Sequence, residues 1–149
     1  MIVVFDLDGT LANCEHRLHH IKNKPKNWKA FFDEMHKDTI IEPLAHLLRL
    51  HVSVGDLVIF CTGRPETHRA MTEEWIYENV KDFNTEIQPI ILYMRAKNDS
   101  RKDYVTKVDL LKQITYDEGK PDIWYDDRRE VVKALRENGI LVLQVADNE

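Results

Sequence analysis

A regular alternation of short apolar runs with segments of helical spacing constrains the fold of this chain more than any other feature. Continuous apolar runs rich in β-branched residues are typical of strands that are buried on both faces of a parallel sheet. The runs that fit this pattern are residues 2–5, 57–61, 88–94, 123–125 and 140–145. We therefore predict five strands, with the connecting segments long enough to cross over the sheet.

Four of the connecting segments carry apolar residues at i, i+3 and i+4, which predicts a helix with one buried face. One begins near residue 42 with Pro43 in its first turn, and another begins near Pro65. The other two span about 103–114 and 130–138, and Gly139 follows the last as a C-terminal cap. Strands that alternate with helices in this way predict an α/β fold, a parallel sheet with helices on both faces.

Residues 14–41 do not fit this alternation, because they are too long for a plain loop between the first strand and the next helix. Trp28, Phe31, Phe32 and Met35 have helical spacing, so we expect one or two short helices here. The segments 16–20 and 22–26 are locally basic. We interpret residues 14–41 as a small helical cap insert that stands over the carboxyl ends of the strands.

The length of 149 residues predicts a single domain, residues 1–149, with a substantial core. No apolar run approaches the roughly 20 residues of a membrane span, so no membrane association is expected. Two cysteines are too few for a disulfide framework, and we expect a cytoplasmic protein. The formal net charge of −5 argues against a protein that coats DNA or RNA, although it does not exclude contact with a strand end.

Polar clusters follow three of the predicted strands. In open α/β sheets, ligands bind outside the carboxyl ends of the strands, so these clusters are expected to meet. Like charges about 4 Å apart repel by about 4 kcal/mol at an effective dielectric constant near 20, and a divalent cation would relieve that repulsion. Oxygen ligands alone favour Mg²⁺ over zinc or copper. The clusters are Asp6 with Asp8, Thr62-Gly63-Arg64, and Asp126-Asp127-Arg128.

Each cluster has an ordinary structural interpretation when it is taken alone. Two aspartates one residue apart often cap a loop, the Thr62 cluster can be a simple turn, and the Asp126 cluster can begin a helix. The three clusters in this order, each at a strand end, are hard to obtain by chance. Their joint occurrence indicates a catalytic or metal site.

With Lys107 in the helix between the last two clusters, this pattern resembles the haloacid dehalogenase superfamily of phosphohydrolases over essentially the whole chain. The resemblance implies a Rossmannoid sheet, Mg²⁺ and a covalent aspartyl-phosphate. It implies that Asp6 is the nucleophile and that Asp8 protonates the leaving oxygen, activates water and binds the metal through its backbone carbonyl. Thr62 would hold a phosphoryl oxygen and Lys107 would neutralise charge. Asp126 and Asp127 would complete the metal site.

Local features are similar in particular to the 3′-phosphatase domains of bacteriophage polynucleotide kinase-phosphatases. The resemblance implies that Gly63 lies in the phosphate-binding turn and that basic residues surround the phosphate. Those basic residues are Arg17, Arg64, Arg95, Lys107 and Arg128. Lys102 is the competing lysine, but the family spacing favours Lys107. The implied substrate is the 3′-phosphate of a nucleic acid end.

Two departures from the phage pattern leave the substrate open. The chain has no P-loop, so these residues provide no kinase site, and a kinase or ligase would be a separate partner. The insert is also longer than its phage equivalent. A nucleotidase or another small-molecule phosphatase is therefore the alternative, with a nucleotide as the ligand. A receiver-like phosphoacceptor and a non-catalytic end-binding module fit less well, because both acids Asp6 and Asp8 are present.

Three further groups of residues have open interpretations. His16, His19 and His20 could act as acid–base groups, but packing or solvent exposure explains them as well. The aromatic residues of the insert could stack on a nucleic acid base or could form the seam of a helix. Cys14 and Cys61 are expected to be small buried hydrophobic residues.

Overall fold

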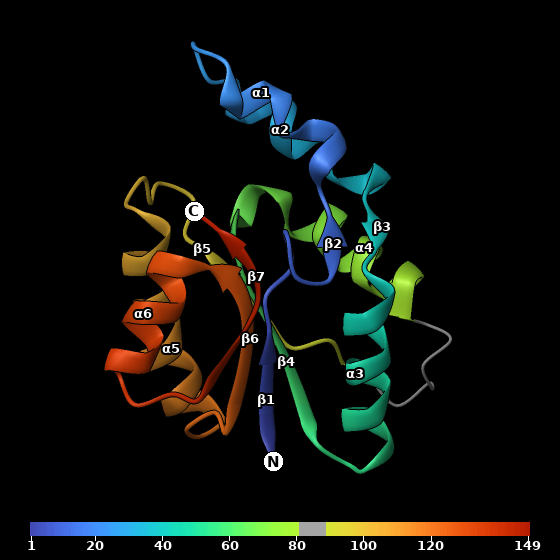
Figure 1. Cartoon of the computed structure of the whole chain (residues 1–149), viewed down its shortest axis with the longest axis vertical. Coiled ribbons are helices and arrows are strands. Elements are labelled where there is room, and N and C mark those ends of the chain that lie inside the picture. Colours follow the sequence, from blue (N-terminus) through green and yellow to red (C-terminus); the bar gives the residue numbers. More distant parts are fainter. Residues whose placement is uncertain (81–88) are drawn as a thin grey trace.

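The computed structural model describes residues 1–80 and 89–149. Its central feature is a five-stranded parallel sheet with the strand order β5-β4-β1-β6-β7. The strands are β1 (Ile2–Phe5), β4 (Leu57–Pro65), β5 (Leu92–Arg95), β6 (Ile123–Arg128) and β7 (Val142–Asn148). The first strand in the sequence lies in the middle of the sheet, so the residues that follow β1 lie between those that follow β4 and β6 (Figure 1).

Alternate residues of the central strands face two separate cores, as a pleated strand requires. Val3 and Phe5 of β1 point into one core, and Val4 between them points into the other. The first core is closed by α3 (Glu42–Ser53) and α4 (Arg69–Val80). The second is closed by α5 (Asp103–Asp117) and α6 (Arg129–Glu137), so helices cover both faces of the sheet (Figure 1). The predicted α/β fold is confirmed.

The strands differ from their predicted bounds mainly at their carboxyl ends. Only β1 has the predicted limits, whereas β4 and β6 continue through the polar clusters that we expected to follow them. The register of β4 on β5 shifts between Thr62 and Pro65, and the register of β6 on β7 shifts between Asp126 and Arg128. Each irregularity interrupts regular pairing at the polar residues. It thereby frees their backbone and side chains to face the end of the sheet.

The other predicted elements need small corrections. The strand predicted over 88–94 is observed as β5, which begins later; residue 88 lies outside the described residues. The helix predicted near Pro65 begins with a short 3-10 turn, η3 (Glu66–His68), before α4. The last helix, α6, ends one residue earlier than predicted, and Gly139 follows it with φ +83°, which suits the predicted cap.

The insert leaves and rejoins the main body through two short antiparallel strands, β2 (Ala12–Asn13) and β3 (Thr39–Ile40). Between them lie η1 (Glu15–Arg17), α1 (His19–Lys22), α2 (Trp28–Asp33) and η2 (Met35–Lys37). These elements project beyond the carboxyl end of β1, at the top of the molecule in Figure 1. The short helices expected between residues 14 and 41 are therefore present.

Candidate active site

Three buried carboxylates meet at the carboxyl ends of β1 and β6. One oxygen from each of Asp6, Asp126 and Asp127 lies within 4.8 Å of the others. Lys107 reaches them from α5 and donates to Asp6 Oδ1 and to Asp126 Oδ2, at 2.7 Å each. Each of the four side chains is nearly inaccessible to solvent. We call these four residues the carboxylate pocket.

Charges in the carboxylate pocket do not balance. Three carboxylates against one ammonium group leave two net negative charges, which matches the charge of one divalent cation. Burial, together with the charge of Asp126, holds the pKa of Asp6 well above its usual range, against the opposing effect of Lys107. Burial lowers the pKa of Lys107, but Asp126 and Asp6 outweigh it and raise that pKa well above its usual range. The three candidate ligands are carboxylates, and a donor set made of oxygen atoms alone suits Mg²⁺.

The carboxylates of the pocket are held in place by neutral donors. The hydroxyl of Thr10 donates to Asp6 Oδ2 at 2.9 Å, and the side-chain amide of Asn148, at the end of β7, donates to Asp127 Oδ2 at 2.7 Å. Gly9 lies against the Asp127 carboxylate with φ +83°, and a β-carbon at this position would overlap that carboxylate. The turn after β1 therefore requires glycine for its backbone conformation and for the space.

We predict that Gly9→Ala removes activity by displacing Asp127. Gly55→Ala is the matched control, because Gly55 has φ +84° but nothing within 4 Å of an added β-carbon. Both variants should lose about 1 kcal/mol of unfolding free energy from the left-handed backbone. Only Gly9→Ala should also lose phosphate release. Urea unfolding and a phosphate-release assay check this, and equal activity in the two variants would contradict the role given to Asp127.

Asp8 faces a different environment from Asp6. Its Oδ1 accepts hydrogen bonds from Arg17 Nη2 at 2.7 Å and from Arg64 Nη2 at 2.5 Å. The same two arginines bind the buried carboxylate of Asp38, at 2.7 Å from Arg17 Nη2 and 3.2 Å from Arg64 Nη2. Two carboxylates and two guanidinium groups thus form a neutral arginine quartet, which we define as Asp8, Asp38, Arg17 and Arg64.

The arginine quartet controls the protonation of Asp8. Burial alone would raise the pKa of Asp8, but the charges of Arg64 and Arg17 outweigh it and hold that pKa below its usual range. The pKa values of Asp6 and Asp8 are therefore shifted in opposite directions although the two residues are almost adjacent. A raised pKa is the property of a general acid and a lowered pKa that of a nucleophile, so these shifts do not assign the roles of Asp6 and Asp8, which rest on their positions.

We predict that Asp38→Asn weakens both the fold and the site, because it leaves two buried guanidinium groups with one carboxylate instead of two. Removal of one partner from a buried ion pair costs about 3–5 kcal/mol. Asp33→Asn is the matched control in the same insert, since the side chain of Asp33 is 43% exposed and pairs with Lys29 on the surface. Chemical denaturation of both variants measures the difference. Equal losses would show that Asp38 does not hold the arginines.

Arg95 and Arg128 converge on Asp103, at the start of α5. Arg95 Nη2 lies 3.3 Å from Asp103 Oδ1, and Arg128 Nη1 lies 3.5 Å from Asp103 Oδ2. Arg95 also donates to the carbonyl of Gly63 at 2.9 Å. A β-carbon on Gly63 would overlap Asp103, so this glycine permits the close approach of β4 to α5. Thr62 is buried, and its hydroxyl accepts from the backbone N–H of Arg64.

The structure therefore brings the residues singled out in the sequence into three connected groups. Asp6, Asp126, Asp127 and Lys107 form the carboxylate pocket, whereas Asp8, Arg17 and Arg64 belong to the arginine quartet. The carboxylate of Asp8 binds the arginines instead of joining the other acids. Arg95 and Arg128 lie around Asp103, with most of their donors engaged by protein groups. The competing Lys102 is exposed, whereas Lys107 is buried.

Several residues of the site were not predicted from the sequence. Asp38 and Asp103 are single acids in polar surroundings, without a local pattern that marks them. Asn148 sits at the end of the last strand, and only the pairing of β7 with β6 places it against Asp127. Thr10 could have been recognised, because it directly follows the first acidic cluster. Both cysteines are buried, as expected.

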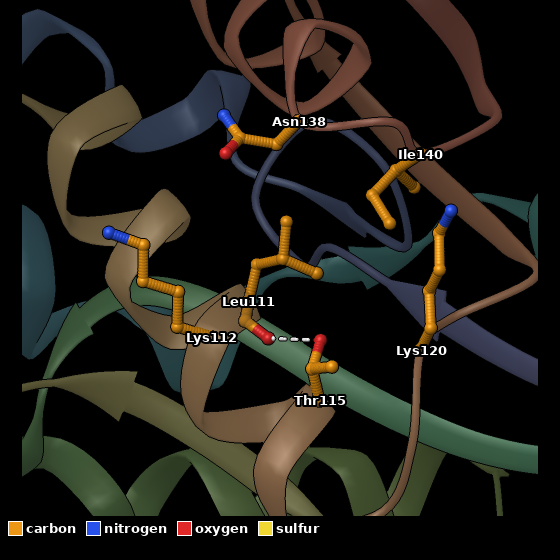
Figure 2. Close-up of a pocket in the computed structure, with 6 residues that line it drawn as sticks. All are labelled: Leu111, Lys112, Thr115, Lys120, Asn138 and Ile140. Carbon is orange, nitrogen blue, oxygen red and sulfur yellow. Dashed lines mark hydrogen bonds between the residues drawn. The ribbon is translucent and has the colours of Figure 1, made fainter.

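A separate hollow of about 350 Å³ lies along the second half of α5 (Figure 2). The helix contributes three of its lining residues, Leu111, Lys112 and Thr115. The hydroxyl of Thr115 donates a hydrogen bond to the carbonyl of Leu111. Its remaining lining residues are Lys120, Asn138 and Ile140. These residues include no carboxylate or activated nucleophile, so the hollow does not compete with the carboxylate pocket as a catalytic site.

Known structures support the fold and the class of protein. In the structure of the Pnkp1/Rnl/Hen1 complex, one chain is 27% identical to this one, with a TM-score of 0.79 over 99% of this chain and 46% of that chain. The structure of the Pnkp1/Rnl/Hen1 RNA repair complex gives 28% identity, a TM-score of 0.79, and 99% and 43% coverage. The present chain thus spans less than half the length of these relatives. A class C acid phosphatase from Bacillus anthracis shares the fold at 12% identity, with a TM-score of 0.62 over 98% of this chain and 66% of that one.

The match to a family model defines a phosphatase domain of the haloacid dehalogenase type. A family model described as "Polynucleotide kinase PNKP phosphatase domain" matches residues 1–149, and the chain belongs to that family. The resemblance stated from the sequence is confirmed. Within the described ranges 1–80 and 89–149, no helix has both the length and the apolar character that a membrane crossing requires.

Proposed function

We propose that this chain is a Mg²⁺-dependent polynucleotide 3′-phosphatase that acts through an aspartyl-phosphate on Asp6. The observation that carries the proposal is the meeting of the Asp6, Asp126 and Asp127 carboxylates at the strand ends beside Lys107. Asp6 lies in the carboxylate pocket beside Lys107, and Asp8 lies in the arginine quartet. We treat residues 1–149 as one catalytic domain in which residues 14–41 form the cap.

Asp6, Asp126 and Asp127 would hold the metal ion, together with the backbone carbonyl of Asp8. When bound, Mg²⁺ supplies the positive charge that lets an anionic nucleophile approach a phosphate dianion. The fit rests on the close approach of three carboxylate oxygens and on the two net negative charges of the pocket.

Asp6 would act as the nucleophile. One of its carboxylate oxygens attacks the phosphorus atom, and the bond from phosphorus to the 3′-oxygen breaks. Lys107 donates to Asp6 Oδ1 and therefore stays beside the reacting centre, where it offsets negative charge. The phosphoryl group is left on Asp6 as an acyl phosphate, so one difficult hydrolysis is divided into two easier steps.

Asp8 would move the protons in both steps. Once the substrate phosphate draws Arg17 and Arg64 away from its carboxylate, Asp8 would take up a proton from solvent and donate it to the leaving 3′-oxygen. It would then accept a proton from the water that attacks the phosphorus of the aspartyl-phosphate. The products of the second step are inorganic phosphate and free Asp6. Before substrate binds, both arginines donate to the same oxygen of Asp8, Oδ1.

The phosphate would be bound by groups around these acids. Thr62 and Gly63 lie in the last part of β4, where its register on β5 shifts, and Arg17 and Arg64 bind Asp38 of the insert. Arg95 and Arg128 lie around Asp103. Binding of substrate would exchange some of their present protein contacts for phosphate oxygens.

A nucleic acid end is the proposed substrate because of the family and because the relatives at 27% and 28% identity occur in complexes named for RNA repair or its components. We propose that a separate kinase or ligase acts on the same ends. The alternative substrate is a nucleoside monophosphate or another small phosphoester, as the sequence left open.

A phosphate-release screen with Mg²⁺ tests the proposal. The substrates are a 3′-phosphorylated oligonucleotide, the same strand with a 5′-phosphate, the 3′- and 5′-mononucleotides, and a sugar phosphate. We expect the highest kcat/KM on the 3′-phosphorylated oligonucleotide and no turnover in EDTA. Equal or greater activity on mononucleotides would overturn the polynucleotide assignment, and full activity in EDTA would overturn the metal assignment.

A further inference from the structure

The insert presents an aromatic cluster of which one ring is open to solvent. The ring of Trp28 packs edge-on against Phe31 at 5.8 Å and lies nearly parallel to Phe32 at 5.9 Å, measured between ring centroids. Phe31 is buried, whereas Trp28 is 49% exposed. The helix-seam interpretation therefore explains Phe31 but leaves much of Trp28 exposed to solvent.

Trp28 is connected to the catalytic acids by a short series of contacts. The guanidinium carbon of Arg17 lies 4.3 Å from the centroid of the Phe31 ring, and Arg17 Nη1 donates to the carbonyl of Phe31 at 3.1 Å. The same arginine binds Asp8 at 2.7 Å. The arginine that contacts the proposed general acid thus also anchors the helix that carries Trp28.

The charge around this ring is opposite to the charge of the whole chain. Residues 14–41 hold six of the lysines and arginines and only four of the acids, while the complete chain has a net charge of −5. One of these acids, Asp38, is buried in the arginine quartet and does not reach the surface. Lys26 Nζ lies 5.6 Å from the centroid of the Trp28 ring, and Lys22 and Lys24 are exposed nearby in sequence.

We propose that Trp28 is a base-stacking platform for the single-stranded polynucleotide whose 3′-phosphate enters the active site. The lysines of residues 22–26 would bind the backbone phosphates beside it. An exposed aromatic ring flanked by basic side chains is the general arrangement by which proteins hold single strands without reading their sequence. The inference rests on the proposed function and deepens it by naming where the strand lies.

The geometry also limits which base can stack. Asp8, Arg17, Phe31 and Trp28 are joined in series by the contacts of 2.7, 4.3 and 5.8 Å given above. A stacked strand rises about 3.4 Å per nucleotide. The base on Trp28 is therefore one of the first few nucleotides from the 3′ end, and affinity should increase with strand length only up to that point.

Steady-state kinetics on two substrates test the platform. The variants are Trp28→Ala, Trp28→Phe and the control Tyr116→Ala, whose side chain is 91% exposed near the end of α5. Trp28→Ala should raise KM for a 3′-phosphorylated oligonucleotide of about six residues by about tenfold with kcat unchanged. Its kinetics on p-nitrophenyl phosphate should not change, and Trp28→Phe should recover most of the loss. An equal loss on both substrates, or none on the oligonucleotide, would overturn the proposal.

Fluorescence gives a readout that does not depend on catalysis. Trp75 and Trp124 are buried, so quenching on addition of an unphosphorylated oligonucleotide should come from Trp28. We expect quenching in the unmodified protein and in Tyr116→Ala, and loss of it in Trp28→Phe. If oligonucleotides are not dephosphorylated but still quench Trp28, the proposed function fails and the platform stands. If they are dephosphorylated without quenching, the platform fails and the proposed function stands.

Discussion

Replacement of Asp6 by asparagine is expected to lower phosphate release by at least about 10⁴-fold while the fold stays intact. A neutral amide oxygen is a poor nucleophile, and no other carboxylate of the pocket occupies the same position. The fold should survive because burial disfavours the charge of Asp6 and because Lys107 keeps its contact with Asp126. Phosphate release and thermal unfolding by circular dichroism measure the two effects.

Asp109→Asn is the control for this experiment, because Asp109 loses the same charge on the exposed face of α5, where it pairs with Arg101. It should retain full activity. Acid-quenched reactions with a labelled 3′-phosphate add a direct test, since label should remain on the unmodified protein and be absent from Asp6→Asn. Comparable activity in Asp6→Asn and Asp109→Asn would remove Asp6 as the nucleophile.

Replacement of Lys107 by methionine is expected to affect both stability and catalysis. It leaves the buried carboxylates of Asp6 and Asp126 without the ammonium group that contacts both of them at 2.7 Å. Loss of a buried partner charge costs about 3–5 kcal/mol of unfolding free energy. Activity should fall by at least about 10²-fold, because the developing charge at phosphorus loses a fixed positive neighbour.

Magnesium should partly restore the stability of Lys107→Met. The pocket gains one further net negative charge in this variant, so a bound cation stabilises the folded state more than it does in the unmodified protein. We expect millimolar MgCl₂ to raise the Tm of Lys107→Met by more than that of the unmodified protein or of Lys112→Met. Lys112 is the matched control, since it lies on the same helix and is 72% exposed. The same Tm shift in all three proteins would contradict the placement of the cation beside Lys107.

The separation of the site into two electrostatic units is compatible with the proposed binding of phosphate by an acidic chain. The arginine quartet is neutral, and the carboxylate pocket needs one divalent cation to become so. The negative charges of the site's acids are thus balanced by neighbouring positive charges. The net charge of −5 would therefore not oppose the binding of a phosphate group at the mouth of the site. The positive balance of residues 14–41 acts in the same direction.

The three acids of the carboxylate pocket could be predicted because each belongs to a short pattern at the end of a strand, and the resemblance to a known family pointed to Lys107. Asp6, Asp126 and Asp127 follow apolar runs directly, and Lys107 lies one helical turn after Asp103. Asp38 could not be predicted in this way. It lies 21 residues after Arg17 in an irregular insert, and tertiary contacts such as the pairing of β2 with β3 bring the two together. Asn148 is similar, because its contact with Asp127 depends on the register of β7.

The sequence by itself determined the alternation of strands and helices and the acids at the strand ends. These features are local, since periodicity and strand-end position depend on neighbouring residues alone. The tertiary structure decided that the pKa of Asp6 is raised and that the pKa of Asp8 is lowered. The groups that bury Asp6 and the two arginines that contact Asp8 belong to segments far apart in the chain. It also decided that Trp28 stays exposed while Phe31 is buried, a choice that identical helical spacing leaves open.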